Sequence, residues 1–474
     1  MLDLIIMNGT VITMEGKGVG VIENGAVGIK GNLIEAVGPT DEVLKAHKAH
    51  RYIDATRKVV MPGFIDAHMH TGLTAIRGVA QDTNNWMQKG IWPFDSCTDE
   101  ETDAAGSLLN IVEAVKAGTT TLCDYDSNMD RLVLNHQKVG TRARLAELIN
   151  AMVPDQSDKK IGALYDHDPA IGNEKFTRNI NLFNNWNGKE NGRITVMMGP
   201  HGPDMMSKEL LLEIREFAKK NNTKLHMHVC QGDREILQME GRYGKRPIPW
   251  MDEIGYLDDT LLAVHLTEAT REETQLLAKR GAAMILCSGS IGIIDGIVPP
   301  AADFIEVSDR LALGSDQAPG NNCNNMFNEM KFTAILNKCK AKDPTVFPAW
   351  RVMRMATIDS AKAIGLGDEV GSLKVGKKAD IILINLDEPC LSPVIQSPIR
   401  NIVPNLVYSA KGSEVEMSII DGKIVMENRR VLTVNEHEVV MAANEAAATI
   451  SKRAEKIFDK LETPIARDMK EGYM

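Results

Sequence analysis

The sequence predicts an α/β protein, a (β/α)8 barrel to which a small all-β domain is attached. Strand and helix patterns alternate through the middle of the chain, over about 300 residues, which favours a barrel over an open sheet. Strand-rich segments with glycine turns fill both ends. A length of 474 residues accommodates a barrel with an appended domain.

The N-terminal segment predicts hairpins. The stretch DLIIMNGTVITM, residues 3–14, has apolar runs around Asn8-Gly9, a pair that favours a tight turn. Residues 25–38, GAVGIKGNLIEAVG, repeat the pattern with Lys30-Gly31-Asn32 as the turn. We expect residues 1–60 to form one part of the β domain.

The second strand-rich segment lies near the other end. It comprises GSLKVGKKADIILINL (371–386) and EVEMSIIDGKIVMENRRV (414–431), where Asp421-Gly422 marks a hairpin. Because the ends of a domain often lie close together, we expect these strands to complete the β domain. The predicted limits are therefore 1–60 and 367–434 for the β domain, 61–366 for the barrel, and 435–474 for a helix (436–463) and tail.

The middle of the chain contains the alternating elements. Strands are predicted in VVMPGFIDAH (59–68), TTTLCD (119–124), RITVMMGPH (193–201), KLHMHVC (224–230), TLLAVHLTE (260–268), AAMILCS (282–288) and RLALGSD (310–316). Helices are predicted at 101–117, where Gly118 ends the pattern, at 207–222 and at 271–281.

Composition excludes several classes of protein. A net charge of −10 argues against a nucleic-acid partner. No run approaches 18 apolar residues, so we expect no membrane span. The seven cysteines are scattered without a CxxC pair, which indicates free thiols in a reducing compartment. The first residues lack the features of a signal peptide, and we expect a cytoplasmic protein.

Histidines and one aspartate stand at the ends of the predicted strands: His68, His70, His201, His226, His228, His265 and Asp316. In a (β/α)8 barrel these ends meet on the face where active sites are built. Residues i and i+2 of a strand share a side, so His68 and His70 can chelate one ion. Imidazole nitrogens with a carboxylate suit zinc or iron.

Several motifs resemble those of the amidohydrolase superfamily. They are VVMPGFIDAHMHTG, GPHGP, HMHVCQGDRE, AVHLTE, LGSDQAPGNNCNNMFNEM and GSLKVGKKADIILI, which occur in the order typical of the family and cover nearly the whole chain. More narrowly, they resemble the metal-dependent aminohydrolases, a branch that includes S-adenosylhomocysteine and methylthioadenosine deaminases, guanine and cytosine deaminases and s-triazine hydrolases.

The resemblance implies a distorted (β/α)8 TIM barrel with a small β-sandwich domain formed by both chain ends. It implies one divalent metal per chain, zinc foremost with iron as the alternative, and a homo-oligomer. The ligands carried over by position are His68, His70, His228 and Asp316. His226 is expected to be a packed core residue. No lysine occupies the bridging position of the binuclear hydrolases, which favours the mononuclear type.

The resemblance also implies a mechanism. The metal supplies a nucleophilic water at neutral pH. Asp316 takes a proton from that water and later gives it to the leaving ammonia. His265 is placed to hydrogen-bond the attacking hydroxide. His201 lies where relatives contact the substrate, with loop capping as the alternative.

Gln231 departs from the family pattern. Relatives carry a glutamate three residues after the ligand histidine, and it protonates the ring nitrogen next to the attacked carbon. An amide cannot shuttle a proton. Three readings stay open: Asp316 moves every proton, Asp233 or Glu235 replaces the missing acid, or the chain is inactive. The change favours a substrate that arrives protonated, such as a cyclic guanidine of creatinine type.

Other positions bear on substrate choice. Relatives carry HNPxSN before the aspartate, whereas LCSGSIG (286–292) lacks that histidine and asparagine and leaves Cys287 and Ser288. Gln317 replaces a common glycine and is a specificity candidate or a loop cap. Within NNWMQKGIWPFD (84–95), Trp86 is the first candidate for an aromatic over the substrate and Trp92 the second.

We therefore expect a metal-dependent aminohydrolase that uses water to remove an exocyclic amino or imino group from a small nitrogen heterocycle, releasing ammonia. Creatinine-, cytosine-, guanine- and triazine-like molecules are the candidate substrates. One alternative is hydrolysis of chloride or alkylamine from a triazine-like ring. Another is a catalytically inactive, metal-containing homologue. We expect no nucleic-acid or membrane partner.

Overall fold

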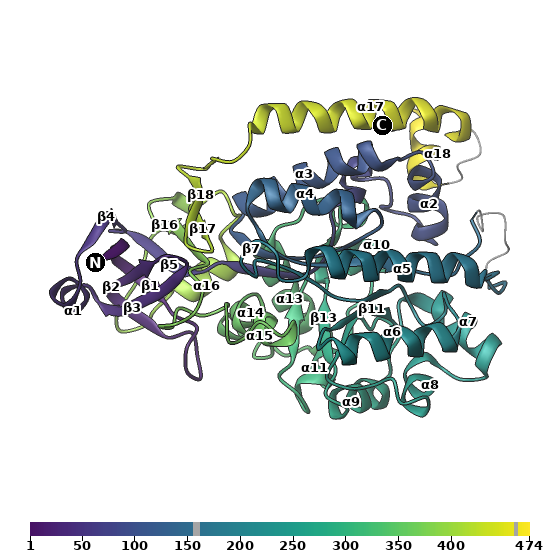
Figure 1. Ribbon diagram of the computed structural model, residues 1–474, viewed down its shortest axis with the longest axis horizontal. Helices are drawn as coiled ribbons and strands as arrows, with labels where there is room; N and C mark the ends of the chain where they lie inside the picture. Colours follow the sequence, from purple (N-terminus) through teal and green to yellow (C-terminus); the bar gives the residue numbers. More distant parts are fainter. Residues whose placement is uncertain (155–161, 459–462) are drawn as a thin grey trace.

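The molecule consists of a β domain at one end and an α/β barrel at the other (Figure 1). The computed structural model describes residues 1–154, 162–458 and 463–474. A long helix, α17 (Glu436–Phe458), runs along the outside of the barrel against α3 (Glu100–Lys116). This confirms the predicted tail helix as far as residue 458; residues 459–462 lie outside the described residues.

The barrel is a closed ring of parallel strands. Its strands are β6 (Phe64–His70), β7 (Thr119–Asp126), β8 (Arg142–Ile149), β9 (Ile194–Val196), β10 (Gly199–Pro200), β11 (Leu225–Val229), β12 (Leu261–His265), β13 (Ala283–Leu286), β14 (Leu311–Leu313) and β15 (Asp316–Gln317). A parallel bridge between Met198 and Leu225 joins β10 to β11, and β15 pairs with β6 to close the ring. The predicted fold class is confirmed.

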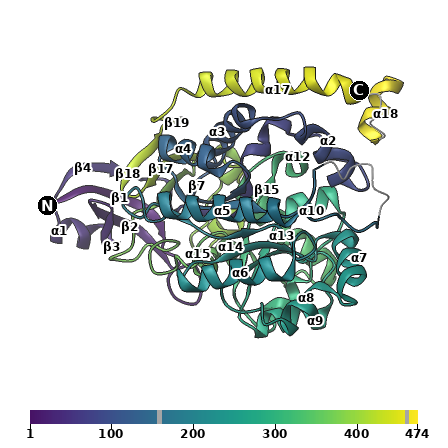
Figure 2. The same ribbon diagram turned by 45° about the vertical axis from the view of Figure 1, so that its right-hand side comes forward.

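Helices cover the outside of the ring (Figure 2). The longer ones are α3, α4 (Met129–Val139), α5 (Pro169–Trp186), α6 (Lys208–Lys220), α7 (Gly232–Tyr243), α9 (Arg271–Lys279) and α13 (Met326–Ala341). In α6 the buried residues Leu210, Leu211, Ile214 and Ala218 form one apolar stripe, and the Ser207 side chain caps the first turn. The helices predicted at 101–117, 207–222 and 271–281 correspond to α3, α6 and α9.

Shorter helices complete the connections: α1 (Thr40–Ala46), η1 (Gly72–Ile76), η2 (Met87–Ile91), α2 (Trp92–Asp95), α8 (Pro247–Glu253), α10 (Ser288–Ile294), α11 (Ala301–Ile305), α12 (Ala318–Asn321), α14 (Ala349–Met355), α15 (Ile358–Ala363), η3 (Pro389–Leu391), α16 (Ile402–Tyr408) and α18 (Pro464–Glu471). No helix in the described ranges is both long enough and apolar enough to span a membrane.

Both chain ends build the β domain. Its strands are β1 (Leu2–Ile12), β2 (Val21–Lys30), β3 (Leu33–Pro39), β4 (Ala49–Asp54), β5 (Lys58–Pro62), β16 (Ile381–Asn385), β17 (Val415–Ile420), β18 (Lys423–Glu427) and β19 (Arg430–Val431). Antiparallel pairing of β5 with β16, in which Val60 lies opposite Leu383, joins the N-terminal strands to the C-terminal ones. The pairing confirms that the two ends form one domain, while the exact limits at 60, 366 and 434 stay a proposal.

Two of the three predicted hairpins are confirmed. Gly31-Asn32 connects β2 to β3, and Asp421-Gly422 connects β17 to β18 with positive φ at both residues, as a two-residue turn requires. The hairpin predicted at Asn8-Gly9 is wrong. β1 continues through this pair as a bulge, with Asn8 at φ 64° and a shift of register against β2. A Cβ on Gly9 would lie 2.8 Å from Val60 Cγ2, so packing against β5 explains the glycine.

Strand β8 was not predicted from the sequence, because charged residues interrupt its apolar run. Arg142, Arg144 and Glu147 are all buried in it. Arg142 reaches from the beginning of β8 into the β domain, where it bonds Asp380 at 2.7 Å and Asp421 at 3.0 Å. The Asp380 carboxylate also accepts the backbone N–H of Asp421. This network ties the barrel to the β domain.

Replacing Arg142 by methionine should therefore destabilise the protein by about 3–5 kcal/mol, because two buried carboxylates lose their partner. Urea unfolding measures the loss. The control is Arg131→Met, which breaks an exposed pair with Glu101 and should cost less than about 1 kcal/mol. Equal stability of the two variants would contradict the assignment.

Candidate metal centre in the barrel mouth

Five buried side chains converge where the barrel strands end. His68 and His70 end β6, His228 lies in β11, His265 ends β12 and Asp316 begins β15. Two overlapping sets of donor atoms result, each with all atoms within 4.8 Å of one another: His68, His228 and His265 form one, and His68, His70 and Asp316 the other. The structure thus brings together every metal ligand expected from the sequence.

The distances between donor atoms fit one small cation. His228 Nε2 lies 3.3 Å from His68 Nε2, and Asp316 Oδ1 lies 3.5 Å from the Nε2 atoms of both His68 and His70. Two donors bound to one tetrahedral zinc at about 2.0–2.1 Å would be about 3.3 Å apart. Three nitrogens and one carboxylate oxygen are also a donor set that zinc accepts.

Burial keeps the imidazoles neutral, so their lone pairs can bind a metal. It lowers the pKa of His68 and His228 well below the usual value, and it lowers the pKa of His265 to about 4. Both ring nitrogens of His265 are buried and have no hydrogen-bond partner within the described part of the chain. An unpartnered buried imidazole is costly in a folded protein, which makes an exogenous ligand the natural partner at this point.

The Nδ1 atoms of two proposed ligands, His68 and His228, have hydrogen-bond partners of their own. His68 Nδ1 lies 2.8 Å from His226 Nε2, and His228 Nδ1 lies 3.0 Å from the backbone oxygen of His201. If His68 binds the metal through Nε2, its Nδ1–H donates to His226. His226 is therefore buried, as expected, but it orients a ligand in addition to packing.

A second network fixes Asp316 beside β6. Asp66, two residues before His68, accepts the backbone N–H of Ser315 at 2.9 Å and also bonds the Ser315 hydroxyl. Asn324 donates to Ser315 Oγ and to the backbone oxygen of Asp316. A Cβ on Gly314 would lie 2.8 Å from His68 backbone atoms, so only glycine permits this approach.

The backbone is strained at the same place. His265 has a φ of 79° and Asp316 a φ of 61°, in the left-handed region that residues other than glycine seldom adopt. Such conformations persist only where surrounding contacts impose them, and they concentrate at functional sites. Ser290, on α10, donates to Asp316 Oδ2 at 2.5 Å. Oδ1 of Asp316 is thereby left facing His68 and His70.

His201 is positioned by two polar residues. Lys175 Nζ, which can only donate, lies 3.0 Å from Asn150 Oδ1 and so fixes the orientation of the amide. Asn150 Nδ2 then donates to His201 Nδ1 at 3.3 Å. The proton of the neutral His201 ring is accordingly on Nε2, and His201 presents an N–H donor. Because burial lowers the pKa of His201 well below the usual value, the ring is neutral.

Comparison with known proteins identifies the family. The model of the amidohydrolase family matches residues 59–425. The chain belongs to the amidohydrolase family. It is 34% identical over 454 residues to the 5-methylthioadenosine/S-adenosylhomocysteine deaminase of Thermoanaerobacter pseudethanolicus, covering 95% of this chain and 100% of that one. It is 35% identical over 468 residues to the 5'-deoxyadenosine deaminase of Methanosarcina acetivorans, covering 96% and 100%.

Solved structures agree with this assignment. An adenosine deaminase from Xanthomonas campestris with bound zinc superimposes with a TM-score of 0.87 at 28% identity, covering 95% of this chain and 99% of that one. An atrazine chlorohydrolase from Arthrobacter aurescens TC1, complexed with zinc, has a TM-score of 0.82 at 19% identity over 94% and 100%, which shows a shared fold alone. The predicted family and enzyme class, a metal-dependent hydrolase of C–N bonds, are confirmed.

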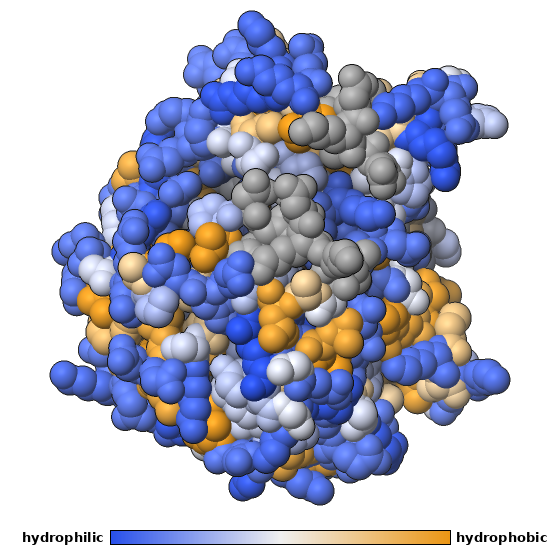
Figure 3. Space-filling view, turned by 90° about the vertical axis from the view of Figure 1, so that its right-hand side faces the viewer, coloured by the Kyte–Doolittle hydropathy of each residue, from blue (hydrophilic) through white to orange (hydrophobic). Residues whose placement is uncertain are grey.

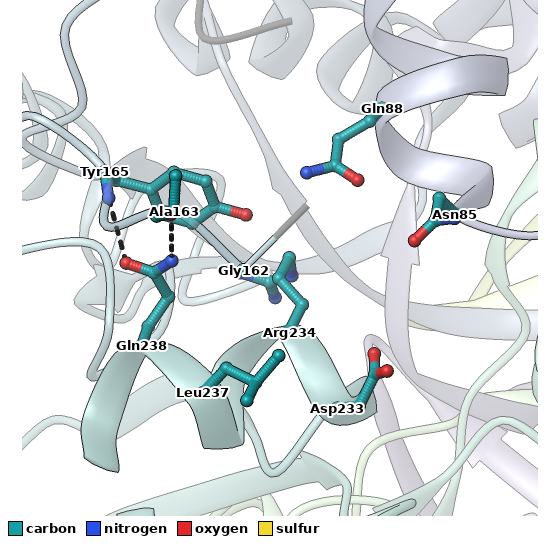
Figure 4. A pocket seen from close by; sticks show the side chains of 9 residues that line it. All are labelled: Asn85, Gln88, Gly162, Ala163, Tyr165, Asp233, Arg234, Leu237 and Gln238. Carbon is teal, nitrogen blue, oxygen red and sulfur yellow. Dashed lines mark hydrogen bonds between the residues drawn. The ribbon is translucent and has the colours of Figure 1, made fainter. Parts of the chain in front are cut away.

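Gln231 lies at the rim of this amidohydrolase site, at the N-terminus of α7, and is buried. Glu235 does not take its place. The Glu235 carboxylate accepts the backbone N–H groups of Cys230 and Gln231 at 2.8 and 2.9 Å. Asp233 is exposed on α7, at the edge of a small pocket that Asn85 and Gln88 line from the opposite side (Figure 4).

The predicted substrate contacts remain proposals. Trp86 is half-buried and donates from Nε1 to Asp295 Oδ1 at 2.8 Å. Trp92 packs edge-on against Tyr165, which favours a packing role for Trp92. Gln317 Oε1 accepts the Gly320 backbone N–H, so the predicted loop cap exists, yet its Nε2 is buried without a partner among described residues. On the side where the strands end, apolar patches lie between hydrophilic ones (Figure 3).

Sequence reasoning missed Asn150, Lys175, Ser290 and Asp295. Asn150 directly follows β8, so recognition of that strand would have marked Asn150 as a strand-end residue. Lys175 and Ser290 lie on helices and Asp295 directly follows α10, so the strand-end pattern gives no signal for them. Only the folded chain places these residues at the mouth.

Replacing a ligand should empty the metal centre. We expect His228→Ala to contain less than about a tenth of the zinc of the parent protein, because a structured site that loses one of four donors binds far more weakly. Metal analysis after dialysis measures this. His437→Ala, which changes an exposed histidine on α17, is the control and should retain the parent's zinc.

His226 should affect metal affinity without being a ligand. His226→Phe keeps the ring but removes the partner of His68 Nδ1, and a lost partner of this kind weakens metal binding about 10- to 100-fold. Competition with a chromophoric chelator gives the affinity. Unchanged affinity in His226→Phe would show that His226 only packs.

Proposed function

We propose that this protein is a metal-dependent deaminase that hydrolyses the exocyclic amino group of an adenine nucleoside altered at its 5′ position. The observation that carries the proposal is the buried cluster of His68, His70, His228, His265 and Asp316 at the strand ends. Its support comes from relatives that match 95 to 96% of the chain and are named as deaminases of 5'-deoxyadenosine, 5-methylthioadenosine and S-adenosylhomocysteine.

The proposed adenine nucleoside differs from the cyclic guanidine of creatinine type that Gln231 favoured in the sequence. The relatives reported above act, by name, on adenosine derivatives, and none of them supports a cyclic guanidine of creatinine type. Adenine carries an exocyclic amino group on a nitrogen heterocycle, so it falls within the general reaction expected from the sequence. Zinc is the proposed metal, as in the adenosine deaminase structure, and a homo-oligomer is the proposed assembly.

Four residues at the mouth are proposed to bind the metal, and one of them also transfers protons. His68, His70, His228 and Asp316 would hold the metal, which supplies Lewis acidity and a nucleophilic water when bound. Asp316 has one oxygen bonded by Ser290 and the other facing the histidines. It can therefore accept a proton from the attacking water and pass it to the departing amino group.

In this proposal the two remaining histidines contact the substrate and the attacking water. His201 Nε2–H donates a hydrogen bond to an acceptor nitrogen of the heterocycle, because Asn150 occupies Nδ1. His265, with both nitrogens unpartnered among the described residues, can orient the water against the attacked carbon. Trp86 and Gln317 remain the proposed further contacts of the substrate.

The two rival functions are tested by the same assay. A different leaving group, chloride or alkylamine, has only the shared fold of a triazine hydrolase in its favour. An inactive homologue is favoured only by Gln231.

We expect ammonia release from 5'-deoxyadenosine, methylthioadenosine or S-adenosylhomocysteine, measured with a coupled assay, and its loss after dialysis against a chelator. Asp316→Asn should lower kcat at least about 1000-fold, since one residue that is both ligand and proton carrier is removed. Release of chloride from a triazine without ammonia from any nucleoside would contradict the proposal. Zinc-loaded protein that turns over none of these substrates would favour the inactive homologue.

A further inference from the structure

One carboxyl group at the barrel mouth has no task in the mechanism above. Asp295 follows α10, the short helix that begins directly after β13. Its Oδ1 accepts a hydrogen bond from Trp86 Nε1 at 2.8 Å. Its Oδ2 is buried and has no hydrogen-bond partner in the ranges that the structure describes. Buried carboxyl oxygens are normally paired, so this oxygen is available to a hydrogen-bonding group of a substrate.

The surroundings of Asp295 place it at the mouth of the barrel. Trp86 comes from the segment after β6. The charges that act on Asp295 belong to Arg234, Glu268 and Asp316, which follow β11, β12 and β14. Residues that follow five strands, counting β13, thus act on or contact one carboxyl group, as expected for a group at the mouth, where the strand ends converge.

Asp295 is also suited to carry a proton. Burial, together with the charges of Asp316 and Glu268, raises its pKa to about 6, while the Trp86 hydrogen bond and Arg234 oppose the rise. An acid with a pKa near the working pH can both hold and release a proton.

The proposed reaction needs such an acid. When water adds to the carbon of an amidine group, the electron pair of the C=N bond moves to the ring nitrogen, which must take up a proton. Gln231 cannot supply one. Glu235 is held by two backbone N–H groups, and Asp316 is occupied with the histidines and the water.

Two carboxyl groups at the mouth have a buried oxygen without a partner among the described residues, Asp204 and Asp295. Asp204 forms an ion pair with Arg234 at 2.6 Å, whereas the hydrogen bond that Asp295 accepts comes from the neutral indole of Trp86.

We propose that Asp295 is a catalytic acid of this deaminase and that its Oδ2 protonates the ring nitrogen beside the attacked carbon. This inference rests on the proposed function. Water adds to the carbon after giving one proton to Asp316, and Oδ2–H gives its proton to the ring nitrogen. Asp316 returns its proton to the amino group, the C–N bond breaks and ammonia leaves. The hydroxyl proton of the adduct restores Asp295.

Trp86 gains a defined role from this arrangement. Its indole N–H occupies Oδ1 and leaves Oδ2 for the substrate. Trp86 is accordingly a positioning residue for Asp295, whether or not its ring also stacks on the heterocycle. Because the indole hydrogen bond lowers the pKa of Asp295, removing it should raise that pKa.

The first test compares two isosteric variants on a nucleoside that the parent enzyme deaminates. Asp295→Asn should lower kcat about 100-fold or more with little change in KM, the usual loss on removing a general acid. Asp368→Asn, on an exposed loop between α15 and β16, is the matched control and should keep the parent rate. An Asp295→Asn enzyme within about threefold of the parent kcat would overturn the proposal.

The second test is rescue. Gln231→Glu offers a new acid at the same rim, so the double variant with Asp295→Asn should be at least about tenfold faster than Asp295→Asn alone. A double variant no faster than Asp295→Asn, when Gln231→Glu by itself is active, would overturn the proposal. If the parent protein deaminates no nucleoside, the proposed function fails and the role of Asp295 fails with it. An active parent with an equally active Asp295→Asn variant overturns the role of Asp295 alone.

The third test separates chemistry from packing. Activity of the parent should fall as the pH rises through the pKa of Asp295, because the protonated form acts. In Trp86→Phe this fall of kcat should occur at a higher pH than in the parent. Zinc content and thermal unfolding are measured alongside. If Asp295→Asn loses its zinc, the pH dependence of kcat in Trp86→Phe becomes the deciding measurement. The proposal is overturned if kcat of this variant falls at the same pH as kcat of the parent.

Discussion

The rest of the structure depends on holding several neutral imidazoles and one carboxylate in contact while all are excluded from water. Burial disfavours the charged form of histidine, so His68, His228 and His265 keep their lone pairs. Those lone pairs point at one another at distances that are unfavourable without a cation and suitable with one. The barrel makes this arrangement stable by anchoring these side chains on four buried strands, β6, β11, β12 and β15.

Closure of the ring is the step that completes the site. Pairing of β15 with β6 places Asp316 opposite Met69 and hence beside both histidines of that strand. Asp66, Ser315 and Asn324 hold this seam through hydrogen bonds that do not involve the proposed ligands' donor atoms. The strained φ of Asp316 is imposed by the same seam. The residues around β14 and β15 therefore both close the barrel and position the proposed ligand Asp316.

The loops around the candidate metal centre differ in which acids they can offer to the proposed reaction. Gln231 removes one proton donor from the rim, and Glu235, close in sequence, is occupied with the backbone of the β11–α7 connection. Asp295, which follows α10 after β13, is held at the mouth by a hydrogen bond from the Trp86 indole. A catalytic group can thus move between loops of a barrel, because all of these loops converge on one cavity whatever their order in the chain.

The sequence alone determined the elements whose signal is local. Glycine turns at 31 and 421–422, the helix pattern of α6, and histidines two residues apart at strand ends all depend on neighbours within a few positions, and the structure agrees with each. Asn8-Gly9 failed because packing against Val60 turned a typical hairpin pair into a bulge. β8 was missed because Arg142, Arg144 and Glu147 are buried through partners far away in the chain. Only the tertiary structure could place Asn150, Lys175 and Asp295 at the mouth. Their hydrogen bonds join residues that are 25 to 209 positions apart in the sequence, and such contacts leave no periodic pattern.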